Sequence, residues 1–155
     1  MTYKVNVGDT IPAFKIKDRD GYDLTDDDLI GNPVVIYFYP KDDTPGCTKE
    51  ACTFRDNMPN FEALDVLVLG VSPDNAESHE KFTKKHDLNF SLLSDENSEL
   101  CRKFDIGRGL LGIERTTFVI DGEGIIRWIE RPVNVSGHVE RVLEALEKMH
   151  TAEPT

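Results

Sequence analysis

The feature that most constrains the fold is an uninterrupted run of apolar and aromatic residues, Val34–Tyr39. A run without polar alternation is typical of a strand buried on both faces, as at the centre of a mainly parallel sheet. A second run of the same character, Val66–Val71, ends at Ser72. A helix is predicted between the two runs, beginning near Thr44. The sequence therefore predicts a strand–helix–strand unit at the centre of the molecule.

Shorter strands and helices are predicted on either side of this unit. The predicted elements are a short strand around Phe14 and Ile16, a tight turn at Asp20-Gly21, a capped helical turn at Thr25–Leu29, a helix at Asn75–His86, a strand at Phe90–Leu93, a helix beginning at Ser94, a hairpin of strands Arg115–Ile120 and Ile125–Ile129, and a helix beginning at Ser136. This order predicts an α/β thioredoxin-like fold, with a central sheet flanked by helices. The length predicts one domain over residues 1–155, with a frayed tail after about residue 150.

The bulk composition excludes several function classes. The 155 residues carry a net charge of −11, which argues against nucleic acid as a partner because phosphate binding needs a basic face. No apolar run approaches the roughly 20 residues of a membrane span, and the first residues do not resemble a signal peptide. The expected compartment is therefore the cytoplasm. Three cysteines in such a protein favour catalytic or redox use over a structural disulfide framework.

The loop and helix start after Val34–Tyr39 place one of these cysteines where a thiolate is favoured. Thr44 is predicted to be the N-cap residue, with its side chain accepting a hydrogen bond from a first-turn amide. Pro45 then takes the first helical position, where a missing N–H has no consequence. Cys47 falls in the first turn, where free amides and the helix dipole favour a negative charge. Cys52 follows five residues later. We hypothesise that Cys47 is a nucleophile and Cys52 its resolving partner.

The helix start needs help from a cation to hold a thiolate. Making an ordinary thiol mostly ionised takes about 3.4 kcal/mol, whereas a helix N-terminus supplies only about 0.3–2 kcal/mol. Arg55, Arg108 and Arg115 are the candidates for this cation. Arg115 is preferred because it opens a core strand that can bring its guanidinium near the loop of the nucleophile. The alternative is a surface arginine at a strand end.

The neighbours of Cys47 suit a peroxide as substrate. Negative charge develops on the departing oxygen when a thiolate attacks a peroxide. The amides around Gly46 and Cys47, the Thr44 hydroxyl and Arg115 are placed to donate to the peroxide oxygens. Gly46 lets a small substrate approach the backbone closely, and Pro40 is placed to shield the thiolate from water.

The five-residue spacing of the cysteines predicts a conformational change. On an intact helix, their Cα atoms are roughly 8.6 Å apart. A disulfide needs Cα atoms within about 7 Å. The first one or two helical turns must therefore unwind if Cys47 and Cys52 are to form a disulfide.

The stretches that carry these residues resemble the peroxiredoxins, and most of all their bacterioferritin-comigratory, or Q-type, branch. The matching stretches span nearly the whole chain: Asp9–Phe14, Tyr37–Lys41, Thr44–Thr48, Glu50–Cys52, Phe54–Asp56, Leu69–Ser72, Phe90–Asp95 and Arg115–Asp121. The segment between Phe104 and Arg115 is shorter than is usual in that family. This difference leaves the rim of the pocket, the substrate preference and the oligomeric contacts open.

The resemblance implies a thioredoxin fold with an N-terminal extension and reduction of hydrogen peroxide and organic hydroperoxides. It implies that Cys47 is the peroxidatic cysteine and forms a sulfenic acid, with Thr44 and Arg115 binding substrate and Pro40 shielding the thiol. Cys52 matches the resolving cysteine, whose intramolecular disulfide thioredoxin or a similar dithiol protein would reduce. No metal or organic cofactor is implied, and a monomer or weak homodimer is expected.

Two other functions are weighed against this one. A thiol–disulfide oxidoreductase shares the fold, but it normally has cysteines only two residues apart, which can bridge without unwinding. A redox-sensing interaction protein is the reading outside enzymes, and no exposed apolar stretch or long tail in the sequence supports it.

Four further features are interpreted as structural. Cys101 is predicted to be a buried inert thiol, and its alternative role is a second partner for Cys47. His79, His86, His138 and His150 are expected at the surface, without the spacing of a zinc site. Pro59 is expected to kink or restart the first long helix. The Gly107-x-Gly109-x-x-Gly112 pattern is read as a flexible loop, because a dinucleotide motif follows a strand and opens a helix.

Overall fold

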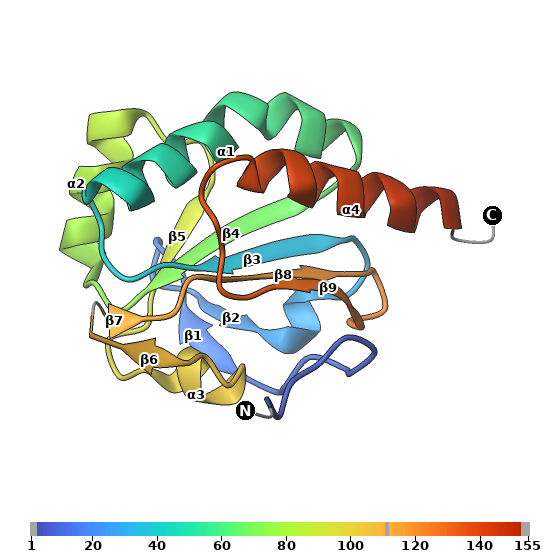
Figure 1. Cartoon of the computed structure of the whole chain (residues 1–155). Helices are drawn as coiled ribbons and strands as arrows, with labels where there is room; N and C mark the ends of the chain where they lie inside the picture. The colour runs from blue at the N-terminus through green and yellow to red at the C-terminus, as the bar shows by residue number, and fades with distance from the viewer. Residues whose placement is uncertain (1–2, 111, 153–155) are drawn as a thin grey trace.

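The computed structural model describes residues 3–110 and 112–152, whose course is shown in Figure 1. The helices are η1 (Asp26–Leu29, a 3-10 helix), α1 (Pro45–Ala63), α2 (Ala76–His86), α3 (Glu99–Lys103) and α4 (His138–Ala152). The strands are β1 (Lys15–Lys17), β2 (Asp23–Thr25), β3 (Val34–Phe38), β4 (Leu67–Ser72), β5 (Ser91–Ser94), β6 (Arg108–Gly109), β7 (Gly112–Ile113), β8 (Thr116–Ile120) and β9 (Ile126–Glu130).

The central sheet is mixed and has the strand order β5-β4-β3-β8-β9. β3 is parallel to β4 and antiparallel to β8, so Tyr37 lies between Gly70 and Thr117. All residues of β3 and β8 are buried, which confirms the prediction of a strand covered on both faces. The sheet and its helices confirm the predicted thioredoxin-like α/β fold.

The sheet separates two apolar cores. α1, α2 and α4 cover one face, and α1 and α4 lie side by side there (Figure 1). α3 and the N-terminal segment cover the other face. Alternate residues of β3 enter the two cores, with Tyr37 facing α1 and Phe38 facing α3, because successive strand side chains point to opposite faces.

The N-terminal extension is a β1–β2 hairpin followed by η1. The turn at Asp20-Gly21 is confirmed: Gly21 has φ +85°, which glycine adopts without steric strain, and its amide donates to the Asp18 carbonyl at 3.1 Å. Thr25 caps η1 in a reciprocal arrangement with Asp28. The predicted helical turn is thus present as a capped 3-10 helix.

The prediction that Pro59 could restart the helix is wrong, because α1 runs without interruption from Pro45 to Ala63, and a kink at Pro59 stays a prediction. Proline cannot donate to the carbonyl four residues earlier, which is that of Arg55. The side-chain amide of Asn89 donates to this carbonyl instead, at 3.3 Å. A partner outside the helix therefore satisfies the acceptor that the proline leaves open.

The glycine-rich segment also differs from its prediction as a flexible loop. β6 and β7 form a small antiparallel ribbon, with Arg108 paired to Ile113 and the side chain of Leu110 fully exposed. The end of the predicted frayed tail, residues 153–155, lies outside the described residues. Up to Ala152 the chain is helical.

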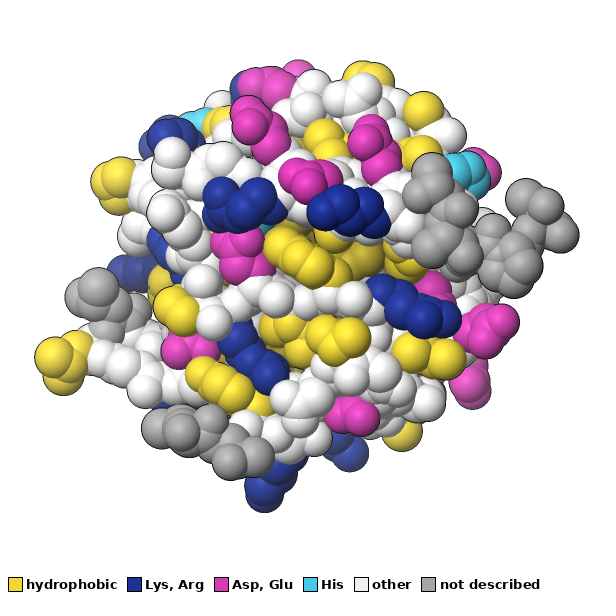
Figure 2. Space-filling model, turned by 45° about the vertical axis from the view of Figure 1, so that its right-hand side comes forward, with side chains coloured by type: hydrophobic (Ala, Val, Ile, Leu, Met, Phe, Trp, Pro, Cys, Tyr) yellow, Lys and Arg dark blue, Asp and Glu magenta, His cyan; other side chains and the backbone are white. Residues whose placement is uncertain are grey.

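The surface mixes charged and apolar side chains. On the face shown in Figure 2, lysines and arginines are interspersed with aspartates, glutamates and apolar groups. Among residues 3–110 and 112–152, no helix combines the length and the apolar character that crossing a membrane requires.

Candidate active site

The site is built where β3 ends and α1 begins. Thr44 occupies the N-cap position, with its carbonyl accepting from the Thr48 amide at 2.8 Å, and Pro45 is the first helical residue. The predicted side-chain cap is wrong, because the Thr44 hydroxyl turns back and donates to the Lys41 carbonyl at 3.0 Å. The first-turn amides are thereby left without a side-chain cap. They remain available to an external acceptor.

Cys47 lies in the first turn of α1, and its side chain belongs to the core between α1 and the sheet. Only 1% of the residue is exposed, so the thiol is almost fully enclosed by the protein. Cys52 is half-buried on the same unbroken helix, and both cysteines are free thiols. The unwinding inferred from their spacing therefore applies to this helix as it stands.

Arg115 lies directly before β8, and its guanidinium covers the start of α1. A Cβ atom added to Gly46 would be only 2.8 Å from Arg115 Nη2. Arg115 Nη1 also donates to Glu50 Oε1 at 3.2 Å. Arg115, which is distant in sequence from Gly46 and Cys47, is thus brought to the helix start that carries them.

The other two candidate arginines are used elsewhere. Arg55 donates to the His86 carbonyl at 2.6 Å and pairs with Asp56. Arg108 donates to the Ser98 hydroxyl at 2.8 Å. Among the three arginines considered from the sequence, Arg115 is the one that the fold places against the helix start.

Glu50 and His138 extend this group into the protein interior, and neither was predicted from the sequence as a site residue. The Glu50 carboxylate is fully buried between Arg115 and His138, with Oε2 3.1 Å from His138 Nδ1. This second contact is close enough for an ion pair but is not aligned as a hydrogen bond. The prediction that His138 lies at the surface is wrong, because it packs edge-on against Phe54 at the start of α4.

Polar atoms without a hydrogen-bond partner in the described part of the chain gather around this group. They are Tyr37 Oη, Thr117 Oγ1, Glu50 Oε2 and both ring nitrogens of His138. Tyr37 and Thr117 are direct neighbours across β3 and β8. Burial, followed by the negative charge of Glu50, raises the pKa of Tyr37 well above its ordinary value. The Tyr37 hydroxyl therefore stays protonated below the active-site helix.

Pro40 forms part of the rim. It is half-buried where the chain leaves β3, and a Cβ atom on Gly112 would be 3.4 Å from its Cβ. The β6–β7 ribbon therefore lies against Pro40. The short segment whose effect the sequence left open thus packs beside Pro40, in the loop before α1.

Cys101 lies away from this group. Its side chain belongs to the core around α3, on the opposite face of the sheet from Cys47. Burial, with a further contribution from Asp95, raises the pKa of the Cys101 thiol to about 12. Both observations support the interpretation as an inert thiol.

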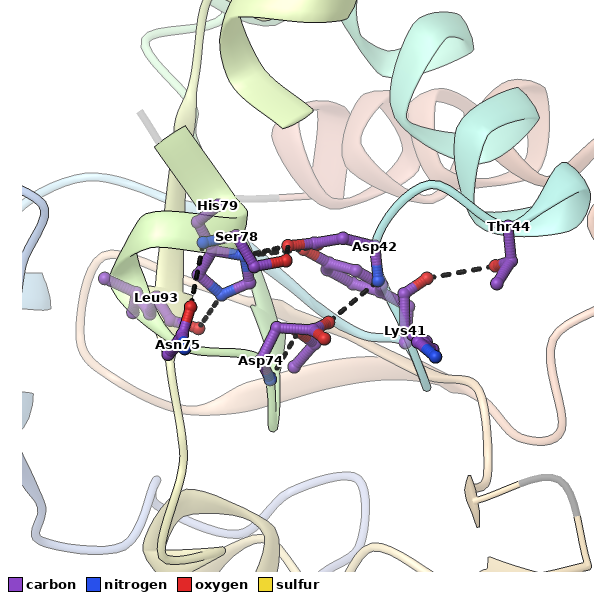
Figure 3. Close-up of polar contacts among 10 residues, drawn as sticks. Lys41, Asp42, Thr44, Asp74, Asn75, Ser78, His79 and Leu93 are labelled. Carbon is purple, nitrogen blue, oxygen red and sulfur yellow. Dashed lines mark hydrogen bonds and ion pairs between the residues drawn. The ribbon is translucent and has the colours of Figure 1, made fainter. Parts of the chain in front are cut away.

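A second buried polar group adjoins the site and was not anticipated either. His79 of α2 is only 4% exposed, so its predicted surface position is wrong. Its Nδ1 lies 2.7 Å from Asp42 Oδ2, as Figure 3 shows. A histidine between Ser78 and Glu80 gives no apolar signal in the sequence. Its burial depends on a carboxylate 37 residues away, in the loop before Thr44.

Comparison with protein families gives one match, to the AhpC/TSA family, over residues 7–129. Among individual proteins, the chain is 44% identical to a putative peroxiredoxin Bcp of Coxiella burnetii, covering 92% of this chain and 99% of that protein. It is 43% identical to peroxiredoxin Bcp of Bacillus subtilis, covering 94% and 97% of the two chains.

Solved structures give the same result. A cysteine variant of Xylella fastidiosa PrxQ superposes with a TM-score of 0.90 at 36% identity, covering 96% of this chain and 99% of that one. The bacterioferritin comigratory protein of Xanthomonas campestris, a structure described for its alkyl peroxide reduction activity, superposes with a TM-score of 0.85 at 36% identity over the same shares.

Proposed function

The chain belongs to the AhpC/TSA family as a thiol peroxidase similar to the Bcp and PrxQ peroxiredoxins, and from this premise we propose which residues carry out its reaction. Cys47 is the peroxidatic cysteine, and Cys52 is the resolving cysteine. Thr44, Gly46 and Arg115 bind the peroxide, and Pro40 shields the thiol. The substrates are hydrogen peroxide and organic hydroperoxides.

In the first half of the proposed cycle, the Cys47 thiolate attacks the nearer peroxide oxygen. A sulfur–oxygen bond forms, the oxygen–oxygen bond breaks, and the departing oxygen takes a proton to leave as water or an alcohol. Cys47 is oxidised to a sulfenic acid and the peroxide is reduced. The uncapped amides at the start of α1 and the Arg115 guanidinium donate to the oxygens as negative charge develops on them.

Glu50 has a positioning role in this half. Its carboxylate holds Nη1 of Arg115, while Nη2 of the same guanidinium lies against Gly46. Since a bound peroxide is small, its affinity and orientation depend on such fixed donors.

In the second half, the Cys52 thiol attacks the sulfenic sulfur of Cys47 and water leaves, forming an intramolecular disulfide. A thioredoxin-like dithiol then exchanges with this disulfide and restores both thiols. The electrons come from the dithiol, so the cycle balances on cysteine sulfur alone and needs no metal or organic cofactor. We also propose that the protein works in the cytoplasm as a monomer or weak homodimer.

The observation that carries the proposal is the position of Arg115 over Gly46, at the start of the helix that holds Cys47. The test is peroxide consumption with thioredoxin and thioredoxin reductase, for wild type, Cys47→Ser and Cys52→Ser. Cys47→Ser should be inactive. Cys52→Ser should lose turnover but still form one sulfenic acid per chain, detected by dimedone labelling and mass spectrometry.

Two outcomes would count against the assignment. Peroxide consumption by Cys47→Ser would remove Cys47 from its role, and full thioredoxin-linked turnover by Cys52→Ser would remove Cys52. Insulin reduction by the wild type without peroxide activity would favour a thiol–disulfide oxidoreductase instead.

A further inference from the structure

The loop between β3 and α1 is held in place through Asp42, by residues of α2 and of the segment just before it. The Asp42 carboxylate is almost fully buried and accepts hydrogen bonds from Tyr39 at 2.6 Å and from the Ser78 hydroxyl at 2.8 Å. His79 Nδ1 lies 2.7 Å from the same carboxylate. The Asp42 amide donates to Asp74 at 2.8 Å. We name Asp42, Asp74, Ser78 and His79 the Asp42 clamp (Figure 3).

The His79 ring is fixed from both sides. Its Nε2 lies 3.0 Å from the Leu93 carbonyl of β5, which can only accept, so this nitrogen carries a hydrogen. Its Nδ1 faces the Asp42 carboxylate, which also only accepts when ionised. The ring therefore joins the central sheet to the loop through two separate contacts, one at each nitrogen.

The clamp is connected to the start of α1 by one short step. Thr44 donates its hydroxyl to the carbonyl of Lys41, the residue before Asp42, and its own carbonyl accepts the first bond of the helix. Asp43 lies between them with φ +58°, a conformation that non-glycine residues rarely adopt, and is held by Lys85 at 2.8 Å. Fixing Asp42 and Asp43 on α2 thus fixes the position of Thr44.

All of these contacts to Asp42 and Asp43 come from outside α1. Unwinding residues 45–52, which the proposed disulfide step needs, breaks none of them. The loop can therefore stay in place while the first turns of the helix come apart.

We propose that His79 and Asp42 are positioning residues that serve the peroxide step and not the disulfide step, with the clamp as the fixed upstream boundary of the unwinding segment. This inference rests on the proposed function. Loosening the clamp displaces Thr44 and the first-turn amides relative to Arg115, which slows attack on the peroxide. It leaves the rate at which Cys52 reaches the Cys47 sulfenic acid unchanged, because the unwinding of residues 45–52 that this step needs breaks none of the clamp contacts.

A pair of histidine substitutions separates the two contacts of the ring. The amide nitrogen of asparagine matches Nδ1 in position, so His79→Asn keeps the polar contact to Asp42 and loses the contact to Leu93. The longer His79→Gln matches Nε2, so it keeps the contact to Leu93 and loses the one to Asp42. Both remove the imidazole and the same ring packing, which makes each the control for the other.

The measurement is a single-turnover stopped-flow experiment on the full chain with hydrogen peroxide, following sulfenic acid formation and then disulfide formation. His79→Gln should form the sulfenic acid about tenfold more slowly than wild type, because small displacements of positioning groups have large effects on rate. His79→Asn should stay within about threefold of wild type. Disulfide formation from the sulfenic acid should be unchanged in both.

Equal slowing of sulfenic acid formation in both variants would show that His79 contributes only packing, and would overturn the proposal. Unchanged sulfenic acid formation in His79→Gln would also overturn it, as would an equal slowing of disulfide formation. If the histidine variants do not fold, Ser78→Ala tests the same carboxylate from the helix surface, and Glu80→Gln on the same helix is its control. Slowing of the first step in Ser78→Ala alone is then required. A wild type that forms no sulfenic acid at Cys47 would overturn the proposed function itself, which distinguishes the two failures.

Discussion

At the residue scale, the Arg115 guanidinium packs directly against the backbone of Gly46. A Cβ atom there would lie 2.8 Å from Arg115 Nη2, a separation that real Cβ contacts do not show. The guanidinium, which is the far end of a flexible side chain, would have to shift away from this position to accept a methyl group. The absence of a side chain at Gly46 is therefore part of how Arg115 is positioned.

We predict that Gly46→Ala lowers the rate constant for peroxide reduction about 10- to 100-fold, because Arg115 loses its position over the site. Stopped-flow kinetics of Cys47 oxidation measure this rate. Arg115→Ala should show a similar loss, and the double variant should be little slower than either single variant. Additive losses would mean that Gly46 acts independently of Arg115.

Cys101 should be unreactive in the folded protein. Burial is the main reason that its pKa is raised to about 12, so it remains a thiol at neutral and mildly alkaline pH. With Cys47 and Cys52 both replaced by serine, iodoacetamide at pH 8 should leave Cys101 unmodified by mass spectrometry until denaturant is added. Labelling of the native double variant at the rate of a free thiol would contradict the burial of this side chain.

Some residues at this site could be predicted from the sequence, and others could not. The helix start at Pro45 and the choice of Arg115 among three arginines followed from local rules and energies. The burial of His79 and His138 did not, because each lies in a polar stretch and is buried by a carboxylate far away in the chain, Asp42 and Glu50 respectively. Partners at such separations are set by tertiary structure and leave no periodic signal.

At the element scale, α1 has two opposing requirements in the proposed cycle. Its first turn has to be formed for Cys47 to face Arg115, and residues 45–52 have to unwind for Cys52 to reach Cys47. The stability of these turns should therefore control the disulfide step. An exposed position on the helix allows that stability to be changed without altering the site.

We predict that Lys49→Gly speeds disulfide formation from the Cys47 sulfenic acid about fivefold, because glycine in a helix interior costs about 1 kcal/mol. Lys49 is exposed and lies between the two cysteines. Asn60→Gly is the matched control, since Asn60 is also exposed on α1 but lies beyond Cys52. Rapid-quench trapping of the sulfenic acid measures the rate, and an equal acceleration in Asn60→Gly would refute local unwinding.

Sequence patterns predicted some of the helices and strands and missed features of others. β3 and β4 were predictable because continuous apolar runs have few other ways to be buried. The continuity of α1 through Pro59 was not, since it depends on Asn89 taking the Arg55 carbonyl from outside the helix. The β6–β7 ribbon was missed because two-residue strands give no measurable alternation.

At the scale of the whole molecule, an ion pair joins the hairpin of β8 and β9 to the C-terminal helix α4. Glu130 at the end of β9 receives two bonds from Arg141 of α4, at 2.7 and 2.8 Å. Burial opposes the charge on Glu130, but the hydrogen bonds from Arg141 and the nearby His138 outweigh it and lower the pKa of the carboxyl. The pair connects α4, which carries His138, to the central sheet.

The lowered pKa of Glu130 makes the stability of the fold depend on pH. A carboxyl whose pKa is lower in the folded chain than its ordinary value of 4.5 stabilises the fold above that value, and the contribution is lost as the pH falls below it. We predict that Glu130→Gln lowers the free energy of unfolding by about 1 kcal/mol at pH 7, because Arg141 remains partly exposed to solvent. Urea unfolding at pH 7 and pH 3.5 measures this, and the difference from wild type should shrink at the lower pH. A difference that stays constant between the two pH values would show that packing, and not charge, makes the contribution.

The single helix that carries both cysteines has a consequence for how the protein fails. In the proposed cycle, the Cys47 sulfenic acid waits for Cys52 while α1 stays wound. During this time a second peroxide molecule would oxidise it further, to a sulfinic acid that dithiols do not reduce. The rate at which these two helical turns unwind thus sets how much peroxide the protein reduces before it is inactivated. A variant with a stiffer first turn should survive less peroxide before it is permanently inactivated, and one with a looser turn should survive more.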